Sequence, residues 1–353
     1  MNNVKTIGVL TSGGDAPGMN GAVRAVVRQA ITNGINVVAI YEGFKGLLEG
    51  NTKEFKMRDV SNIISRGGTI LYSARSEEFR TTEGVKAGYD MARKLGIDAL
   101  IGIGGDGTLR GLRDLCALGL PCIGVPATID NDMTATDYTI GYDTALNTGM
   151  EMVDKLRDTC ESHFRCNVVE VMGRRAGYLA LNIGLATGAA QVVTTEVQYD
   201  DEWMFSEIIR GKENKKRHYI IMVAEGVEGY GQSIVKCIQE RTGIETRLTQ
   251  LGHVVRGGSP TVRDRVMASR MGIEAVNLLM NGKENLLVAK VENKLTSVDI
   301  DYALALDKMF KDKLSSDEHS HFQRNEITKM RAICDRKRQN FSELYRQTLE
   351  ISQ

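Results

Sequence analysis

The fold is decided by the stretch Thr6-Ile-Gly-Val-Leu-Thr-Ser-Gly-Gly-Asp-Ala-Pro-Gly18. Its apolar first half predicts a short buried strand, and its glycine-rich second half predicts a turn that ends the strand. Apolar side chains then recur at helical spacing from Ala22 to Ile31, and Gly34 ends that pattern. Residues 37–41 follow as a second apolar strand. A strand, loop, helix and strand in this order predict a parallel sheet with right-handed crossovers.

The same order of elements recurs along most of the chain. Alternating strands and helices predict an α/β fold with two Rossmann-like three-layer units and mostly parallel sheets. Further strands are predicted over residues 99–103, 121–125, 167–172 and 219–224, and a further helix over residues 262–280.

No proline- or serine-rich linker separates the two series of elements, so we expect the chain to cross between two domains more than once. The larger domain is predicted to combine residues 1–141 with 255–304, and the smaller domain residues 142–254 with 305–320. Residues 321–353 lack glycine, are densely charged and carry apolar side chains on one helical face. This pattern predicts a C-terminal helical extension.

Composition limits the classes of partner. The chain has 353 residues, with 45 Lys and Arg against 45 Asp and Glu, so its formal net charge is zero. Nucleic acids and membrane surfaces are held mainly by an excess of positive charge, and neither is expected as a partner. No apolar run approaches the roughly 18 residues of a membrane-spanning helix, and the first residues lack a signal-peptide core. With six cysteines in no metal-binding spacing, these features predict a cytoplasmic protein.

Three polar clusters each follow a predicted strand. They are Thr11-Ser-Gly-Gly-Asp-Ala-Pro-Gly18, Gly104-Gly-Asp-Gly-Thr108 and Thr128-Ile-Asp-Asn-Asp132. In open α/β sheets the ligand lies outside the carboxyl ends of the strands, so we expect these clusters to converge. The first cluster can offer backbone N–H groups and a helix N-terminus to a phosphate group. An ordinary turn between a strand and a helix is the alternative.

In the second cluster, small residues surround Asp106. They allow a phosphate chain to lie against the backbone, and the Asp106 carboxylate suits Mg²⁺ bound among phosphate groups. In the third cluster, Asp130 and Asp132 lie two residues apart and therefore on one side of an extended loop. One of them can accept a proton from a hydroxyl group while the other holds Mg²⁺. A structural turn is the alternative for either cluster.

Several arginines stand in loops or at the ends of predicted elements. Guanidinium groups bind phosphate oxygens in bidentate geometry, although a surface ion pair is the alternative for any one of them. Together with Glu225 and His253 they exceed what one nucleotide needs, which predicts a second, phosphorylated substrate. These arginines are Arg75, Arg80, Arg165, Arg174, Arg247 and Arg256.

As a set, these motifs closely resemble the 6-phosphofructokinase family. The resemblance runs in order from about Val4 to about Asp307. It implies transfer of the γ-phosphoryl group of ATP to the 1-hydroxyl of fructose 6-phosphate, a step of glycolysis, with Mg²⁺ as cofactor. It also implies allosteric control and a homotetramer. The matching stretches are Thr11–Asn20, Gly104–Thr108, Thr128–Asp132, Val169–Arg174 and Leu251–Pro260.

The resemblance also implies roles for individual residues. Asp130 is implied as the general base, and Arg165 and Arg247 are implied to reach the sugar phosphate of a neighbouring subunit. The implied catalytic residues are Arg75, Thr128, Asp130 and Arg174, and the implied Mg²⁺ ligands are Asp106 and Asp132. The implied ATP-binding residues are Gly14, Phe44, Arg75, Ser76, Gly105, Asp106, Gly107 and Thr108. The implied residues for fructose 6-phosphate are Thr128, Asp130, Arg165, Met172, Gly173, Arg174, Glu225, Arg247, His253 and Arg256.

The phosphoryl donor depends on two positions. Members of the family that use pyrophosphate carry aspartate where this chain has Gly107 and lysine where it has Ala127. A carboxylate about 4 Å from the α-phosphate would repel it by about 4 kcal/mol at an effective dielectric constant of about 20. Glycine therefore predicts ATP, with pyrophosphate as the alternative. The sequence also leaves open an inert regulatory homologue, or a lipid or NAD kinase that shares only residues 104–108.

An effector site is implied at one helix. Arg24 and Arg28 lie four residues apart on one face, and with Arg157 they match the effector-phosphate arginines of bacterial members. A solvated helix face is the alternative for the pair. The positions that depart from the family pattern are Met57, Asn62 and Ala190.

Overall fold

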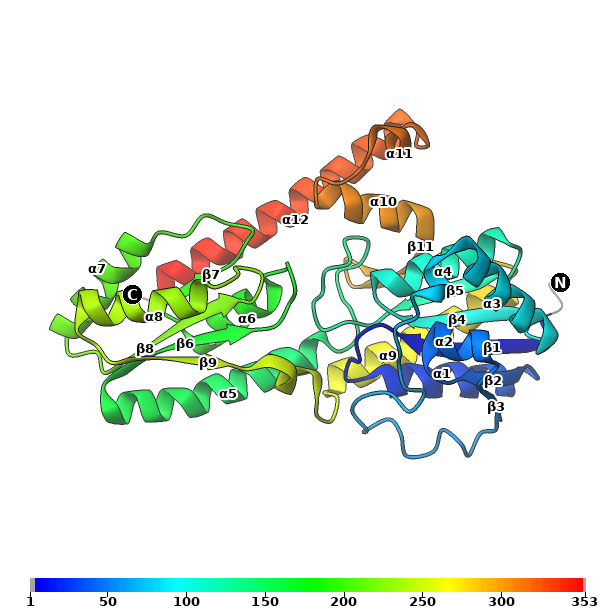
Figure 1. The fold of residues 1–353 in the computed structure, drawn as a ribbon, viewed down its shortest axis with the longest axis horizontal. Helices are drawn as coiled ribbons and strands as arrows, with labels where there is room; N and C mark the ends of the chain where they lie inside the picture. The colour runs from blue at the N-terminus through cyan, green and yellow to red at the C-terminus, as the bar shows by residue number, and fades with distance from the viewer. Residues whose placement is uncertain (1–3, 352–353) are drawn as a thin grey trace. The chain divides into compact units, whose positions relative to one another are not determined.

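The computed structural model describes residues 4–351, which divide into two compact units (Figure 1). The predicted domains also included residues 1–3 and 352–353, which lie outside the described residues. Residues 305–320, predicted with the smaller domain, group with unit 1, because helix α10 (Ile300–Phe310) packs against α4 (Asp106–Ala117), β10 (Leu286–Val291) and β11 (Lys294–Asp299) of that unit. Unit 1 holds the described residues of Met1–Ile129, Met133–Thr144 and Arg256–Arg331. Unit 2 holds those of Asp130–Asp132, Ala145–Val255 and Ala332–Gln353.

A seven-stranded sheet forms the centre of unit 1, in the order β11-β10-β5-β4-β1-β2-β3. The edge strands β3 and β11 run antiparallel to their neighbours, and the others are parallel. Every residue of β4 and β5 is buried, as parallel strands covered on both faces require. The strands are β1 Thr6–Ser12, β2 Asn36–Ile40, β3 Thr52–Phe55, β4 Ala99–Gly104, β5 Cys122–Pro126, β10 Leu286–Val291 and β11 Lys294–Asp299.

Helices pack against this sheet (Figure 1). α1 and α9 lie along each other, and Gly272 allows their approach, because a Cβ there would lie 2.8 Å from the Ala22 carbonyl oxygen. The helices are α1 Met19–Thr32, α2 Gly43–Glu49, α3 Thr82–Lys94, α4 Asp106–Ala117, α9 Val262–Met280, α10 Ile300–Phe310 and α11 Ser316–Ser320, with a 3-10 turn η1 at Glu78–Arg80.

Unit 2 is built on a four-stranded parallel sheet in the order β7-β8-β6-β9. Its core is formed by fully buried side chains of the central strands, among them Val168, Ile221 and Val223. The strands are β6 Arg165–Val171, β7 Gln191–Val193, β8 His218–Ala224 and β9 Thr246–Gln250. The other elements are α5 Tyr142–His163, α6 Tyr178–Thr187, α7 Asp201–Glu213, α8 Tyr230–Thr242 and the 3-10 turn η2 Gly252–Arg256.

The predicted C-terminal extension is the long helix α12, Arg324–Ile351. Its predicted apolar face is confirmed, since Met330, Phe341 and Tyr345 are buried. The Phe341 ring meets the edge of Tyr178 in α6, with the ring centroids 5.3 Å apart.

The mostly parallel α/β architecture predicted from the sequence is thus confirmed in both units. The helix predicted over residues 262–280 is α9, with the same bounds. Within residues 4–351, every helix is too short or too polar to span a lipid bilayer.

Candidate active site

The carboxyl ends of three adjacent strands of unit 1 bring the predicted phosphate-binding loops together. Ser12 of β1 is aligned with Gly104 of β4, and Gly104 is aligned with Pro126 of β5. The Thr108 hydroxyl donates a hydrogen bond of 3.1 Å to the Ser12 carbonyl oxygen, which joins the first two loops. A Cβ on Gly104 would lie 2.3 Å from that oxygen, so only glycine fits there. Within unit 1 the first two loops and the start of the third therefore converge as expected, whereas Asp130–Asp132 of the third loop group with unit 2.

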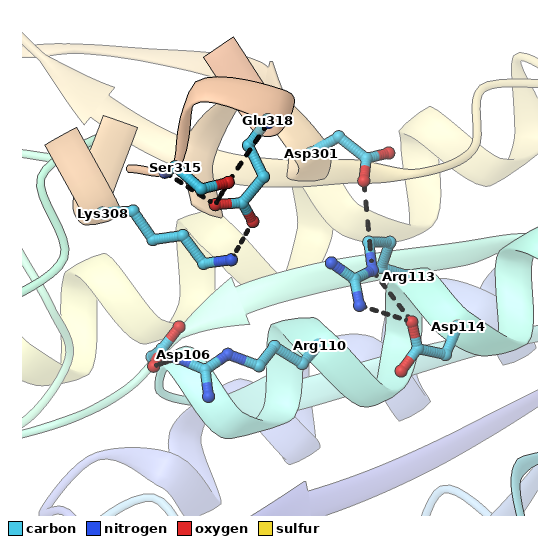
Figure 2. A network of polar contacts seen from close by, with 8 residues as sticks. All are labelled: Asp106, Arg110, Arg113, Asp114, Asp301, Lys308, Ser315 and Glu318. Carbon is cyan, nitrogen blue, oxygen red and sulfur yellow. Dashed lines mark hydrogen bonds and ion pairs between the residues drawn. The ribbon is translucent and has the colours of Figure 1, made fainter. Parts of the chain in front are cut away.

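Asp106 is the first residue of α4, where the helix N-terminus faces the loops. Its carboxylate Oδ2 lies 2.5 Å from Nη2 of Arg110, one turn along the same helix (Figure 2). The neighbouring Arg113 points elsewhere, to Asp114 at 2.7 Å and Asp301 at 3.9 Å. An exposed pair of this kind contributes only a few tenths of a kcal/mol, roughly, so a stronger cation can replace the arginine.

Among residues 4–351 there is no group of three or more His, Cys, Asp or Glu side chains arranged to hold a metal ion. A dedicated protein cage is therefore absent from the described part of the chain. Mg²⁺ in nucleotide enzymes is commonly held by one or two carboxylates, substrate phosphates and water. The carboxylate of Asp106, which is 23% exposed, fits that mode of binding. Asp132 is half-buried in the short segment 130–132 that groups with unit 2.

Arg256 lies against the first phosphate loop. Its Nη1 donates to the Asp15 carbonyl oxygen at 3.1 Å, and its side chain is only 15% exposed. A Cβ added to Gly14 would lie 2.2 Å from the same Nη1. The absence of a side chain at Gly14 thus allows a guanidinium group to rest directly on the loop.

The other residues predicted to bind ATP line the same loops. The Ser73 hydroxyl donates to the Gly13 carbonyl oxygen at 2.5 Å, and Arg75 follows two residues later with its side chain exposed. The Ser76 hydroxyl accepts the N–H of Phe79 at 3.2 Å. Phe79 stacks on Phe44 with 4.3 Å between ring centroids. Ser73 was not predicted, because a serine in a loop carries no distinctive signal.

Thr128 is held by two contacts with the chain that precedes α5. Its N–H donates to the Ile140 carbonyl oxygen at 3.0 Å, and its own carbonyl oxygen accepts the hydroxyl of Thr139 at 2.6 Å. A Cβ on Gly105 would lie 3.9 Å from the Thr128 Cβ. Thr128 is thus beside the loop that carries Asp106.

Unit 2 carries a second cluster around Asp130. The Asp130 side chain is 2% exposed, and its Oδ2 lies 3.4 Å from Nε of Arg174. Arg174 follows β6 in a turn with φ of +148° at Gly173 and +54° at Arg174. Glu225 holds this turn, since its Oε1 accepts the N–H of Gly173 at 3.0 Å and of Arg174 at 2.6 Å. A left-handed arginine needs such support, because the conformation is strained.

Arg174 and Glu225 also line a cavity of about 560 Å³ in unit 2. Apart from two glycines, its lining residues carry charged or amide side chains, and their carboxylate and amide oxygens can accept hydrogen bonds from hydroxyl groups. Met172 and Gly173 precede Arg174 in the turn after β6 but are not among the lining residues, and His253 is exposed in η2. The other lining residues are Glu170, Arg175, Gly226, Glu228, Gly229, Gln232 and Gln250.

Arg165 and Arg247 lie away from this cavity. Both pair with Glu245, Arg165 at 2.9 Å and Arg247 at 2.5 Å, and these hydrogen bonds hold the pKa of Glu245 below its usual value. Arg165 begins β6, whereas Arg174 lies beyond the end of that strand. At about 3.3 Å per residue, the seven-residue strand places Arg165 about 20 Å from the turn that carries Arg174. The two predicted sets of sugar-phosphate arginines are therefore separate within one chain.

The predicted effector arginines fall in both units. Arg24 and Arg28 share one face of α1, and burial together with the charge of Arg28 lowers the pKa of Arg24. Arg157 of α5 belongs to unit 2, where burial and its charge lower the pKa values of Lys216 and His218. Lys216 and His218 were not predicted. The run of basic residues over 215–218 was the sequence signal that could have indicated them.

Comparison with known proteins matches this arrangement. A model of the family described as Phosphofructokinase matches residues 6–279. A protein of Halalkalibacterium halodurans named ATP-dependent 6-phosphofructokinase is 54% identical over 297 residues, which cover 84% of this chain and 93% of that protein. A protein of Clostridium tetani with the same name is 50% identical over 311 residues, covering 88% and 97%.

The similar solved structures also include phosphofructokinases. Phosphofructokinase from Saccharomyces cerevisiae superposes with a TM-score of 0.85 at 36% identity over 98% of this chain. This chain spans about half of that longer yeast chain, 50% of its length. A pyrophosphate-dependent phosphofructokinase from Marinobacter aquaeolei has a TM-score of 0.74 at 20% identity, covering 84% and 83% of the two chains, and shares the fold.

Proposed function

This chain belongs to the phosphofructokinase family, and from that premise we propose that it transfers the γ-phosphoryl group of ATP to the 1-hydroxyl of fructose 6-phosphate. The products would be ADP and fructose 1,6-bisphosphate. The observation that carries the proposal is the pair formed by the buried Asp130 carboxylate and Arg174. Arg174 lies on a turn that Glu225 holds through backbone hydrogen bonds. A general base and a guanidinium group are what this transfer requires of the protein.

We assign the proton transfer to Asp130. Its carboxylate would accept the proton of the 1-hydroxyl as that oxygen attacks the γ-phosphorus. Arg75 and Arg174 would neutralise the charge on the phosphoryl oxygens, and Thr128 would lie beside the transferred group. Backbone N–H groups at Gly14 would add hydrogen bonds to the same oxygens. Positioning and charge neutralisation supply most of the rate in phosphoryl transfer, and these groups would supply them together with Mg²⁺.

The proposed donor is ATP. A Cβ at Gly107 would meet no atom of the described residues within 4 Å, which leaves room along the loop for a nucleotide. Phe44 and Ser76 would flank it, with Gly105, Asp106, Gly107 and Thr108 along its phosphates. Asp106 and Asp132 would hold Mg²⁺, which when bound neutralises charge on the donor phosphates.

Most residues proposed for the acceptor belong to unit 2, and Thr128 and Arg256 belong to unit 1. The polar wall beside Arg174 and Glu225 supports hydrogen bonding to sugar hydroxyls. The full proposed set is Thr128, Asp130, Met172, Gly173, Arg174, Glu225, His253 and Arg256, with Arg165 and Arg247 contributed to a neighbouring subunit. The distance of about 20 Å between Arg165 and the Arg174 turn supports this sharing, because one chain cannot bring both to one small sugar.

A homotetramer with shared active sites is therefore part of the proposal. An effector site at Arg24, Arg28 and Arg157 is a further part of the proposal. It is supported by the arginine pair of α1 and by the basic side chains of Arg157, Lys216 and His218 in unit 2. The cytoplasmic location stays a prediction from the sequence.

One assay tests the activity. The purified chain is given fructose 6-phosphate with ATP or with pyrophosphate, each with and without Mg²⁺, and fructose 1,6-bisphosphate is measured. We expect product with ATP and Mg²⁺ only. Turnover with pyrophosphate alone would contradict the proposed donor. Binding of either substrate without turnover would favour an inert regulatory homologue.

A further inference from the structure

Asp264 is a buried carboxylate of unit 1 that has no part in the steps above. It is 0% exposed and lies in the first turn of α9, where its N–H donates to the hydroxyl of the N-cap Thr261 at 3.3 Å. A buried carboxylate is costly unless its oxygens accept hydrogen bonds. The groups that donate hydrogen bonds to the Asp264 carboxylate therefore indicate its structural role.

Four donors meet this carboxylate, and all of them come from residues 138–144. Oδ1 accepts the hydroxyl of Tyr138 at 2.5 Å and the N–H of Gly141 at 2.7 Å. Oδ2 accepts the N–H of Thr144 at 2.8 Å and its hydroxyl at 2.5 Å. Because one backbone N–H points at each oxygen, both oxygens must act as acceptors, and the carboxylate is held in one orientation.

The segment fastened by Asp264 is the one that supports Thr128. The Thr139 hydroxyl donates to the Thr128 carbonyl oxygen at 2.6 Å. Thr128 donates its N–H to Ile140 at 3.0 Å, and Ile140 donates its own to the Pro126 carbonyl oxygen at 3.0 Å. Three hydrogen bonds thus tie the chain beyond β5 to the segment that Asp264 holds.

The first phosphate loop packs against the same place. A Cβ on Gly18, which has φ of +106°, would lie 2.7 Å from Cγ2 of Ile140 and 3.5 Å from Cβ of Asp264. A Cβ on Gly141 would lie 2.6 Å from Cβ of Ala16. No space remains for an added carbon between the phosphate loop and residues 140–141. Any movement of that segment would therefore be transmitted to the loop.

We propose that Asp264 is a positioning residue for the phosphoryl transfer: it fixes residues 138–144, and through them the relative position of Thr128 and the loop that carries Gly14. The proposal rests on the proposed function. It adds a residue that touches neither substrate but sets the geometry of groups that do. Errors of about 1 Å in such geometry can cost about 100-fold in rate, so a rigid connection at this point is useful.

The first test compares two carboxylates of unit 1. Asp264→Asn keeps the side-chain shape but turns an NH₂ group toward the N–H of Gly141 or Thr144. We expect kcat to fall by about 10-fold to 100-fold while both KM values change by less than about 3-fold. Asp98→Asn is the matched control, because Asp98 also accepts two backbone N–H groups, from Lys5 at 2.8 Å and Thr6 at 3.0 Å, at the opposite end of β1. Its kcat should stay within about twofold.

An unchanged kcat in folded Asp264→Asn would overturn the proposal. If this variant fails to fold, the next connection gives the answer. Thr139→Val removes the hydroxyl that donates to Thr128, and Thr139→Ser keeps it. We expect a loss of kcat in the valine variant and near-normal kcat in the serine variant. Equal kcat values in the two variants would overturn the proposal, because packing alone would then account for Thr139.

Hydrogen exchange tests the same connection without any substrate, so a failure of the proposed activity would not obscure it. In Asp264→Asn the amides of Thr128 and Ile140 should exchange at least about tenfold faster, while amides of β8 in unit 2 keep their rates. Faster exchange confined to Gly141 and Thr144 would show that Asp264 does not position Thr128, and would overturn the proposal.

Discussion

Asp106 and Asp130 are both carboxylates paired with an arginine, yet they are held in opposite ways. The Asp106 side chain is 23% exposed, and its partner Arg110 stands one turn along the same helix. The Asp130 side chain is 2% exposed, and Arg174 reaches it from a turn after a different strand. The Arg174 side chain is itself 63% exposed, so the difference between the two pairs lies in the burial of the Asp130 carboxylate. An exposed local pair can exchange its partner readily, whereas a buried carboxylate depends on the groups that position it. The first suits a metal ligand, and the second suits a fixed base.

The largest expected effect comes from removing the buried member. Asp130→Ser should lower kcat by about 10²-fold to 10⁴-fold, the usual contribution of a positioned base, and leave the binding of fructose 6-phosphate largely intact. Steady-state kinetics and equilibrium binding measure the two quantities. Asp137→Ser is the control, because that carboxylate accepts the Glu292 N–H at 2.9 Å and has no proposed role. Full turnover of the Asp130 variant would remove it from catalysis.

A second variant adds charge at the start of α4, where Gly107 is exposed. Gly107→Asp places a carboxylate where the α-phosphate of ATP is proposed to lie, and a repulsion of up to about 4 kcal/mol would lower kcat/KM for ATP by as much as about 10³-fold. The loop has room for the side chain, so the fold should be retained. Gly107→Ala is the control without charge. Unchanged ATP kinetics in the aspartate variant would contradict the proposed path of the nucleotide.

A third variant tests how Glu225 supports the turn that carries Arg174. Glu225→Ala leaves the N–H groups of Gly173 and Arg174 without their shared acceptor, and kcat/KM for fructose 6-phosphate should fall by about 10-fold to 100-fold. Glu225→Gln keeps an oxygen that can accept both, so it should recover most of the loss. Glu196→Ala is the control, since Glu196 accepts the Gly177 N–H at 2.7 Å. A glutamine variant as impaired as alanine would show that the negative charge itself is required.

The smallest effect is expected at the exposed pair. Arg110→Gln frees Asp106, and the loss of a pair worth about 0.3–0.5 kcal/mol should lower the Mg²⁺ concentration for half-maximal rate by about twofold. Arg113→Gln is the control on the same helix, because Arg113 pairs with Asp114 and Asp301 (Figure 2). If kcat/KM for ATP fell tenfold or more in Arg110→Gln, Arg110 would contact the nucleotide itself.

The sequence predicted the strands and loops at the proposed phosphate-binding edge, and the structure of unit 1 confirms that Gly14, Asp106 and Thr128 follow the ends of three adjacent strands. Half-exposed edge strands such as β3 and β11 were not predicted, because their alternation of few apolar residues is a weak signal. Burial of Met330 and Phe341 in α12 was predicted, since a helical face needs only local periodicity.

Spacing along the chain could not reveal the contacts that hold the site. Asp264 looks like an ordinary acidic residue near a helix start, yet four hydrogen bonds reach it from residues 138–144. Arg256 was predicted for the sugar phosphate, and its place on Gly14 follows from how two distant segments pack.

By itself the sequence determined which loops carry glycine and carboxylate and that they gather at one edge, because parallel strands end on the same side of a sheet. Only the tertiary structure decided which of those groups are buried, which are paired and which are held rigid. Burial and pairing arise between residues far apart in the chain, and the free energy of such contacts depends on packing that no local pattern encodes.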